Sequence, residues 1–131
     1  MKRRLVVVAA LAMLAGCHRS ESIQLVSHQP VPAGLAQKMA PASYDRLYAE
    51  AALSKNWKPI QTAPGRIRAS ITIRQSHDLT VEIDYSATEY TLVVVSSENL
   101  NQENGTIHPA ANKAIRGLRD AIDTALARAA L

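Results

Sequence analysis

Five polar side chains in the second half of the chain are the strongest candidates for chemistry or ligand binding. They are two histidines, a serine and two asparagines: His77, Ser97, Asn99, His108 and Asn112. His108 precedes the predicted last helix and Asn112 lies one turn later, so both side chains can share a face of that helix. Such a group could bind a small polar ligand, a peptide terminus or a glycan. The alternative is structural, because Asn, Ser and His also cap helices and satisfy the backbone groups of loops.

A metal site or a catalytic site would be a more specific use of the same residues. His77 and His108 could bind a metal together with Asp78 or Glu98, but the histidines lack the close spacing of a zinc site. No Gly-x-Ser-x-Gly or Ser-x-x-Lys sequence marks an activated serine. We therefore expect no metal and no other cofactor, and a binding or interaction module in preference to an enzyme. The alternative is a small hydrolase of the cell envelope that uses His108 or His77 as its base.

The only cysteine, Cys17, offers a different chemistry, the covalent attachment of lipid. Lys2, Arg3 and Arg4 precede an apolar stretch over residues 5–15, which leads into the sequence Leu-Ala-Gly-Cys. A basic head, an apolar segment and small residues at the cleavage point are the layout of a secretory signal. The apolar stretch is about half of the roughly 20 residues that a membrane-spanning helix needs, so a permanent transmembrane anchor is the weaker interpretation.

Leu-Ala-Gly-Cys resembles the lipobox of bacterial lipoproteins. The resemblance implies that the Cys17 thiol is thioether-linked to a diacylglycerol, that cleavage removes residues 1–16, and that an acyl chain such as palmitate is added to the new amine. Several acyl chains anchor a protein stably, whereas a single chain holds it only marginally. The alternative is an ordinary secretory signal that happens to contain a cysteine. His18 stands where an Asp favours inner-membrane retention in enteric bacteria, so we expect an outer-membrane protein whose domain faces the periplasm, with the inner membrane as the alternative.

Removal of residues 1–16 changes the charge of the protein. The 131 residues include 15 basic and 11 acidic ones, and the loss of Lys2, Arg3 and Arg4 leaves 12 against 11, a net charge of +1. This nearly neutral balance removes the main support for nucleic acid as a partner. The expected partners are the membrane, through Cys17, and an envelope protein that the sequence does not identify. The rest of the chain divides into a tether over residues 17–22 and a single domain over residues 23–131.

The first part of this domain is predicted to be a short strand followed by a helix. Residues 23–27 alternate in polarity until Pro30 ends the pattern. From Pro41 to Lys55 the apolar side chains recur at spacings of three and four, which is typical of an amphipathic helix. Asn56 suits the left-handed position past the end of this helix, and Trp57 can fold back over its last turn. The connection that follows is predicted to be irregular because it contains Pro59, Pro64 and Gly65.

An antiparallel hairpin gives the clearest pattern in the sequence. Apolar and polar residues alternate over residues 66–74 and again over residues 79–85, and residues 75–77 form the predicted turn. A register that places Arg68 opposite Asp84 pairs both the inner apolar residues and the outer charges. Exposed ion pairs of this kind contribute only about 0.2 to 1 kcal/mol each, so we expect them to select the register more than to stabilise the fold.

The remaining elements complete the predicted fold. A third strand is expected over residues 90–96, and its Leu-Val-Val-Val run is apolar on both faces, so its outer side should be partly covered or adhesive. Residues 96–108 are polar and predicted to be a loop. A helix starts at Pro109, and its apolar stripe consists of Ile115, Leu118, Ile122, Ala125 and Ala129. The sum is a two-layer α+β domain: a short N-terminal strand, a helix, a three-stranded antiparallel meander and a C-terminal helix packed on the sheet.

A series of ordered residues across the middle of the chain carries a further resemblance. The series is Trp57, Pro64-Gly65, Arg68-Ala69, His77, Tyr90, Ser97, Asn99-Leu100, Ile107-His108 and Asn112. It resembles a group of small proteobacterial lipoproteins over about residues 44–122, which implies an envelope location and a similar fold but no particular activity. The chain departs from that pattern, because Asn56 replaces a Gly, and Ala111 and Ala114 stand where Tyr and Trp are expected. These departures weaken the case for an aromatic surface beside the last helix.

Overall fold

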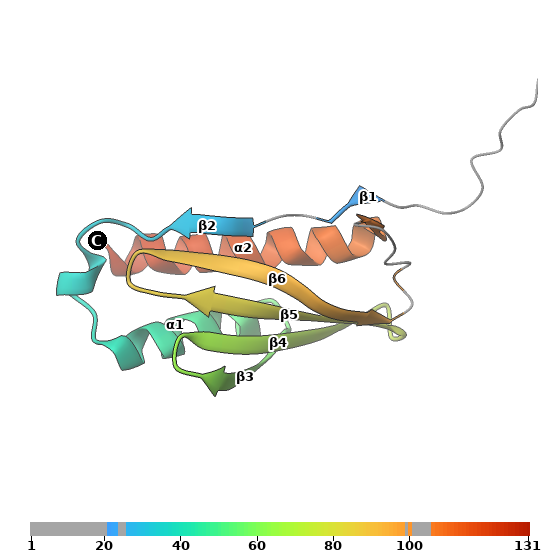
Figure 1. The fold of residues 1–131 in the computed structure, drawn as a ribbon, viewed down its shortest axis with the longest axis horizontal. Coiled ribbons are helices and arrows are strands. Elements are labelled where there is room, and N and C mark those ends of the chain that lie inside the picture. Colours follow the sequence, from blue (N-terminus) through green and yellow to red (C-terminus); the bar gives the residue numbers. More distant parts are fainter. Residues whose placement is uncertain (1–20, 24–25, 99, 101–105) are drawn as a thin grey trace, which may run out of the picture.

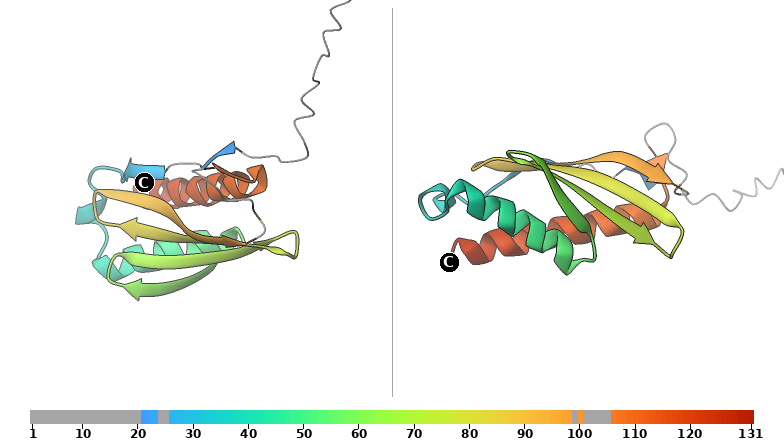
Figure 2. Two further views of the ribbon diagram at one scale, coloured as in Figure 1. Left: turned by 45° about the vertical axis from the view of Figure 1, so that its right-hand side comes forward. Right: turned by 90° about the horizontal axis from the view of Figure 1, so that it is seen from below.

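The structure has an α+β fold in two layers, a five-stranded antiparallel sheet with two helices on one of its faces (Figures 1 and 2). It is a computed structural model that describes residues 21–23, 26–98, 100 and 106–131. The elements in chain order are β1 (Glu21–Ser22), β2 (Val26–Pro30), a short 3-10 helix (Leu35–Gln37), α1 (Pro41–Ser54), β3 (Lys58–Ala63), β4 (Arg66–Ile73), β5 (His77–Tyr85), β6 (Glu89–Glu98), β7 (Thr106–Ile107) and α2 (Pro109–Ala129). The predicted fold class is confirmed, including the C-terminal helix on the sheet.

The sheet is a meander with one added strand. Its strand order is β2-β6-β5-β4-β3, so the consecutive strands β3 to β6 are neighbours and β2 pairs with β6 at one edge. A separate pair joins β1 to β7, with Glu21 opposite Ile107 and Ser22 opposite Thr106. Residues 21 and 22, predicted to be part of the tether, therefore belong to the fold. The predicted N-terminal strand lies at Val26–Pro30, slightly later than expected.

The molecule has two distinct ends, each formed by a different set of turns and helix termini. β1, β7, the start of α2 and the β4–β5 turn lie at one end, which we call the β1 end (Figure 1). The start of α1, the end of α2, the β3–β4 turn and the β5–β6 turn lie at the opposite end, which we call the far end (Figure 1). Helix α2 runs along the molecule between the two ends.

Helix α1 ends as its sequence predicts. Asn56 has a φ of 67°, and the Trp57 amide donates to the Ala52 carbonyl while the Asn56 amide donates to the Leu53 carbonyl. These two bonds form the Schellman motif, which satisfies carbonyls that the end of a helix leaves without partners. The motif turns Trp57 back into the core, where its side chain is fully buried.

Residues 58–63 form a strand, and the predicted irregular connection is wrong there. β3 pairs with β4 at the edge of the sheet, with Lys58 opposite Ser70 and Gln61 opposite Ile67. Pro59 is compatible with this place because an edge strand leaves some backbone amides without a partner strand. The polarity pattern of β3 is weak because none of its side chains is fully buried.

The register of the β4–β5 hairpin differs from the predicted one by two residues. Arg66, and not Arg68, lies opposite Asp84, and the turn consists of residues 74–76. A shift of two residues keeps every side chain on its face of the sheet, so the alternation of polarity could not distinguish the two registers. The turn itself is unusual, because Arg74 and Gln75 have φ values of 52° and 69°. The three-residue turn thus contains two residues in the left-handed conformation, and neither of them is the glycine that would have indicated it in the sequence.

Strand β6 contains a bulge that changes which residues face the helices. Val81 lies opposite Val94 and Thr80 lies opposite Ser96, which leaves Val95 without a counterpart on β5. The bulge moves the inward positions from even to odd residue numbers, because a bulge inserts one residue into the alternation. Val93 and Val95 are 45% and 41% exposed, so the outer side of this apolar run is largely uncovered.

The core lies between the sheet and the two helices. The buried positions of α2 are Ala111, Asn112, Ile115, Leu118, Ile122 and Leu126. Three of the predicted stripe residues are thus fully buried, while Leu126 takes the place expected for Ala125, which is only partly buried with Ala129. Facing them on the sheet are the buried side chains of Ile67, Ala69, Leu79, Val81, Ile83, Tyr90 and Leu92. Within the described ranges, no helix combines the length and the apolar character needed to cross a membrane.

Candidate functional site

The predicted cluster of histidine, serine and asparagine lies at the β1 end. His77 is the first residue of β5, and Ser97 lies opposite Leu79 on the neighbouring strand. Opposed residues of an antiparallel pair share a face, so Ser97 faces the helices only because the bulge at Val95 precedes it. Asn99 lies outside the described residues. The structure therefore brings the described members of the cluster to one end of the molecule.

His108 and His77 contact each other through their rings. The ring centroids are 6.4 Å apart and the planes differ by 8°. The Nδ1 atom of His108 accepts a 3.0 Å hydrogen bond from the Ala110 amide, which caps the first turn of α2. The Nδ1 atom of His77 is buried and has no hydrogen-bond partner among the described residues. His108 thus uses one of its two ring nitrogens for the fold.

Asn112 also serves the fold. Its Nδ2 atom donates a 2.6 Å hydrogen bond to the main-chain carbonyl of Ser22 in β1, and only 2% of the residue is exposed. A buried amide stays favourable only when its polar atoms are paired. Two of the predicted site residues, His108 and Asn112, therefore make the contacts expected from the structural alternative.

The outer face of the sheet holds a set of paired charges. The Arg66 Nε atom lies 2.8 Å from Asp84 and 3.2 Å from Glu82, and Arg68 lies 3.6 Å from Glu82. These contacts raise the pKa of Arg66, chiefly through its hydrogen bond to Asp84. The arginines that could meet an anionic surface are thus largely neutralised within the sheet. Two hollows of about 480 and 630 Å³ lie on this face, one beside Asp78 and Glu98 and one beside His28 and Glu89.

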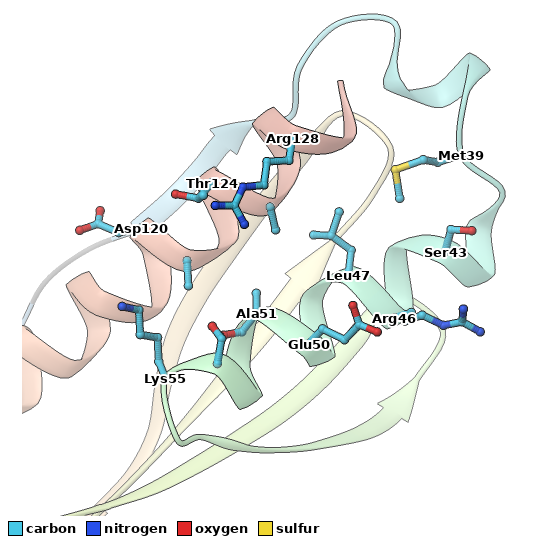
Figure 3. A pocket seen from close by; sticks show the side chains of 13 residues that line it. Met39, Ser43, Arg46, Leu47, Glu50, Ala51, Lys55, Asp120, Thr124 and Arg128 are labelled. Atoms are coloured by element: carbon cyan, nitrogen blue, oxygen red, sulfur yellow. The ribbon is translucent and has the colours of Figure 1, made fainter. Parts of the chain in front are cut away.

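A groove of about 600 Å³ separates α1 from α2 on the side away from the sheet (Figure 3). Its floor is formed by Leu47 and Ala51 of α1 and by Ala121 and Ala125 of α2. Charged residues stand along its rims, namely Arg46, Glu50, Lys55, Asp120 and Arg128. Both signs of charge are present, and the floor contains only aliphatic side chains, so this groove is a solvated seam between two amphipathic helices.

A second concavity, at the far end, has a different chemical character. It has a volume of about 410 Å³ and lies between the start of α1, the β3–β4 turn and the β5–β6 turn. We call it the far-end pocket, and its lining consists of Ala36, Met39, Pro41, Tyr44, Asp45, Gln61, Pro64, Gly65, Tyr85, Ser86 and Ala87. Asp45 is its only ionisable carboxylate, and this group accepts a hydrogen bond from the Tyr85 hydroxyl. An apolar cavity with a few convergent polar groups is the usual form of a ligand site.

The pocket is connected to the core through stacked tyrosines. Tyr48 stacks on Tyr85 with 4.3 Å between ring centroids and meets Tyr90 edge-on at 5.8 Å. Tyr90 in turn donates a 2.5 Å hydrogen bond to Asp123 on α2. Burial raises the pKa of Tyr85 and of Tyr90, and their hydrogen bonds to Asp45 and Asp123 raise it further. Both tyrosines are therefore protonated hydrogen-bond donors at neutral pH.

The far-end pocket was not predicted from the sequence. Tyr44 and Asp45 lie in the first half of α1, while Tyr85 ends a strand forty residues later. Their only sequence signal is an aromatic residue at each of two element ends, which is also what an ordinary core contact shows. A metal centre is not indicated either, because the described residues contain no group of three or more His, Cys, Asp or Glu side chains placed to hold an ion.

Comparisons of the chain with protein-family models, with curated proteins and with solved structures found no match. The resemblance to small lipoproteins, which rests on the Trp57 to Asn112 series, stays a prediction. The proposed function therefore depends on the sequence and on the geometry of the chain's own residues.

Proposed function

We propose that this chain is a lipid-anchored protein of the bacterial cell envelope whose domain acts as a binding module. The observation that carries the first part is the sequence Leu-Ala-Gly-Cys at residues 14–17, which follows a basic head and an apolar stretch and holds the only cysteine of the chain. A thiol at this place is what lipidation requires, and no other residue of the chain offers one.

The start of the fold determines how this anchor would orient the domain. Strand β1 begins at Glu21, four residues after Cys17. Four residues span at most about 14 Å, so a lipid on Cys17 would hold the β1 end close to the bilayer. Helix α2 has 21 residues and, at about 1.5 Å per residue, extends roughly 32 Å toward the far end. The far-end pocket would then stand away from the membrane and open to the aqueous compartment.

The outer membrane is the proposed destination, with the domain in the periplasm. Residue 18 is His, and the Asp that favours inner-membrane retention in enteric bacteria is missing from that position. The inner membrane is the alternative destination.

A binding module fits the geometry better than an envelope hydrolase does. His108 accepts a helix-capping bond through Nδ1, and His77 has its Nδ1 atom buried. Within the part of the chain that the structure describes, the helix groove, the far-end pocket and the two hollows on the outer sheet face are lined by residues other than these two histidines. A general base must reach a substrate proton, and a cavity beside the base is the usual means. The far-end pocket, in contrast, offers a shaped apolar surface with one carboxylate.

Labelling of cells with palmitate tests the anchor. The wild-type chain should incorporate the label and float with outer-membrane vesicles on a density gradient, and the Cys17→Ser variant should do neither. A matched control combines Cys17→Ser with Ser20→Cys, which restores a thiol three residues away, and this chain should stay unlabelled because the position and not only the thiol is recognised. The proposal is contradicted if that control incorporates palmitate, or if mass spectrometry of the native product finds an unmodified Cys17. Flotation with inner-membrane vesicles corrects only the destination.

Site-specific crosslinking in living cells tests the binding module. A photo-crosslinking amino acid in place of Ala87, in the far-end pocket, should give defined adducts. The same amino acid in place of Lys113, exposed on α2 near the β1 end, is the control and should give fewer. Adducts that form only at position 113 would place the binding surface at the other end of the molecule.

A further inference from the structure

The far-end pocket has walls suited to an apolar group. Met39 comes from the segment that leads into α1 and Pro41 is the first residue of α1, while Pro64 and Ala87 come from the two turns that close the sheet at this end. Its volume of about 410 Å³ lies near the lower limit of typical ligand cavities. Such a space is large enough to hold a group of the size of one large side chain.

Asp45 gives the pocket an acidic centre without a cation beside it. Its carboxylate accepts the Tyr85 hydroxyl, and no Lys, Arg or His of the described residues lies within salt-bridge distance of it. A carboxylate has about four lone-pair positions, of which the Tyr85 hydroxyl occupies one. Glu82 and Asp84 on the outer face of the sheet differ in this respect, since both pair with Arg66.

Two aromatic rings complete the pocket. Tyr44 and Tyr85 both line it, and Tyr44 is only 5% exposed, with its hydroxyl oxygen unpartnered among the described residues. The faces of aromatic rings attract cations, and the attraction strengthens where water is excluded. Carboxylate, aromatic rings and apolar walls together form the chemistry that recognises an organic ammonium group.

We propose that the far-end pocket binds a primary ammonium group attached to an apolar body. The ammonium would pair with Asp45 beside the rings of Tyr44 and Tyr85, and the apolar body would lie against Met39, Pro41 and Ala87. Both a small amine and the free amino terminus of a peptide carry this chemistry. The inference rests on the proposed role as a binding module and names its ligand class.

Titration followed by NMR tests the ligand class on the processed protein purified in mild detergent. Phenethylammonium should shift the backbone amides of Gly65 and Ala87, and its neutral analogue phenethyl alcohol should not. Asp45→Asn removes the charge and keeps the shape, and it should weaken phenethylammonium binding by about tenfold or more, because a desolvated charge pair is lost. Asp123→Asn is the matched control, since it removes the same charge from the other tyrosine–aspartate pair, outside the pocket, and it should bind like the wild type.

A second variant covers the case in which Asp45→Asn fails to fold. Ala87 is exposed in the β5–β6 turn, so Ala87→Leu leaves the core untouched and narrows the pocket. It should weaken binding without a change in melting temperature. The inference is overturned if phenethylammonium causes no shift, if phenethyl alcohol binds equally well, or if both Asp45→Asn and Ala87→Leu bind like the wild type.

Two further comparisons distinguish a small amine from a peptide terminus as the ligand, and they test this inference separately from the proposed lipid anchor. A peptide Phe-Ala-Ala with a free amino terminus that binds more tightly than phenethylammonium, and loses binding when acetylated, indicates a peptide terminus. Tighter binding of phenethylammonium indicates a small amine. Absence of amine binding by a protein that does incorporate palmitate rejects the ligand class alone, whereas amine binding by a protein with an unmodified Cys17 rejects the anchor alone.

Discussion

The side chain of Asn112 in the last helix donates a 2.6 Å hydrogen bond to the carbonyl of Ser22 in the first strand. The two residues are ninety positions apart, and the bond connects the first strand to the last helix at one end of the molecule. Through it a buried amide holds β1 and β7 against the start of α2. Asn112, which the sequence suggested as a ligand-binding residue, thus connects the first and last elements of the domain.

Replacement of Asn112 should therefore reduce stability. We expect Asn112→Ala to lower the free energy of unfolding by about 1 to 3 kcal/mol, because the Ser22 carbonyl loses a buried partner. Chemical denaturation followed by circular dichroism measures the effect. Lys113→Ala, an exposed neighbour, is the control and should stay within about 0.5 kcal/mol of the wild type. Equal stability of the two variants would show that the bond contributes nothing.

His108 should be replaceable by another helix-capping residue. We expect His108→Ala to destabilise the fold by about 1 kcal/mol, because the Ala110 amide loses its acceptor. His108→Asn should restore most of the loss, since Asn is a preferred cap. Thermal unfolding measures both variants. A fully stable His108→Ala protein, or one that Asn does not rescue, argues that the ring has another role.

Gly65 should tolerate substitution less well than Gly34. Both residues have positive φ values, 74° and 88°, which disfavour a residue with a Cβ by about 1 to 2 kcal/mol. A Cβ at Gly65 would also lie 2.8 Å from the Tyr85 carbonyl, whereas one at Gly34 would meet only the Gln37 side chain at 3.8 Å. We therefore expect Gly65→Ala to be the more destabilising by at least about 1 kcal/mol, measured by denaturant unfolding. Similar losses in the two variants would mean that the backbone near Tyr85 yields easily.

The β4–β5 turn should be stabilised by glycine at a chosen position. Gln75 has a φ of 69°, so Gln75→Gly removes left-handed strain of about 1 to 2 kcal/mol and adds an entropic cost of about 0.5 to 1 kcal/mol. The net expectation is a gain of up to about 1.5 kcal/mol in unfolding free energy. Ser76→Gly is the control, because Ser76 lacks a positive φ, and it should be destabilising. A gain in the control equal to that at position 75 would contradict the explanation.

Alkaline pH should unfold the protein through its buried tyrosines. Burial raises the pKa of Tyr48 and Tyr90 above the ordinary value of 10.0, so above pH 10 the unfolded chain releases protons that the folded chain retains. Stability is thus complete below pH 10 and falls above it, by roughly 3 kcal/mol per pH unit once Tyr48 and Tyr90 titrate only in the unfolded state. The raised pKa of the more exposed Tyr85 makes this fall steeper. Phenolate absorbance should rise together with loss of the circular dichroism signal.

Tyr90→Phe provides the control for the alkaline transition. It removes one of the three tyrosines with a raised pKa and leaves Asp123 exposed to water, so it should reduce the slope of stability against pH by about a third to a half. An unchanged slope would show that Tyr90 ionises in the folded protein.

The helices were predictable because their boundaries are local. Pro41 at the start of α1 and Asn56 beyond its end are recognised by backbone chemistry that involves only neighbouring residues. The stripe of Ile115, Leu118 and Ile122 likewise needs no knowledge of the partner surface. The α+β class followed from these patterns and from the alternating strands.

The strand pairings were less predictable because they depend on distant partners. β3 has a proline and no strong alternation, and it becomes a strand by pairing with β4. The predicted hairpin register is wrong by two residues because Arg68 finds a carboxylate in either register, Asp84 in the predicted one and Glu82 in the real one. Only the left-handed conformations of Arg74 and Gln75 select the true turn, and their sequence does not signal them.

In the candidate sites, too, local features were predictable and contacts between distant residues were not. His108 at the start of α2 was placed correctly from the sequence, and its contact with His77 could not be foreseen because it depends on the hairpin register. The far-end pocket was missed for a related reason. Asp45 becomes a candidate binding residue only through its position beside Tyr85, whose hydroxyl donates a hydrogen bond to it. The two residues meet because α1 crosses beneath the end of β5.

The sheet has an open strand at each side, and each of these strands contains a proline, Pro30 in β2 and Pro59 in β3. A protein confined to a membrane surface diffuses in two dimensions and meets its own copies far more often than it would in free solution. Backbone groups along an open strand would then invite sheet-to-sheet polymerisation. By removing an amide from each side, the prolines would oppose such pairing between copies that the proposed lipid anchor holds on one membrane.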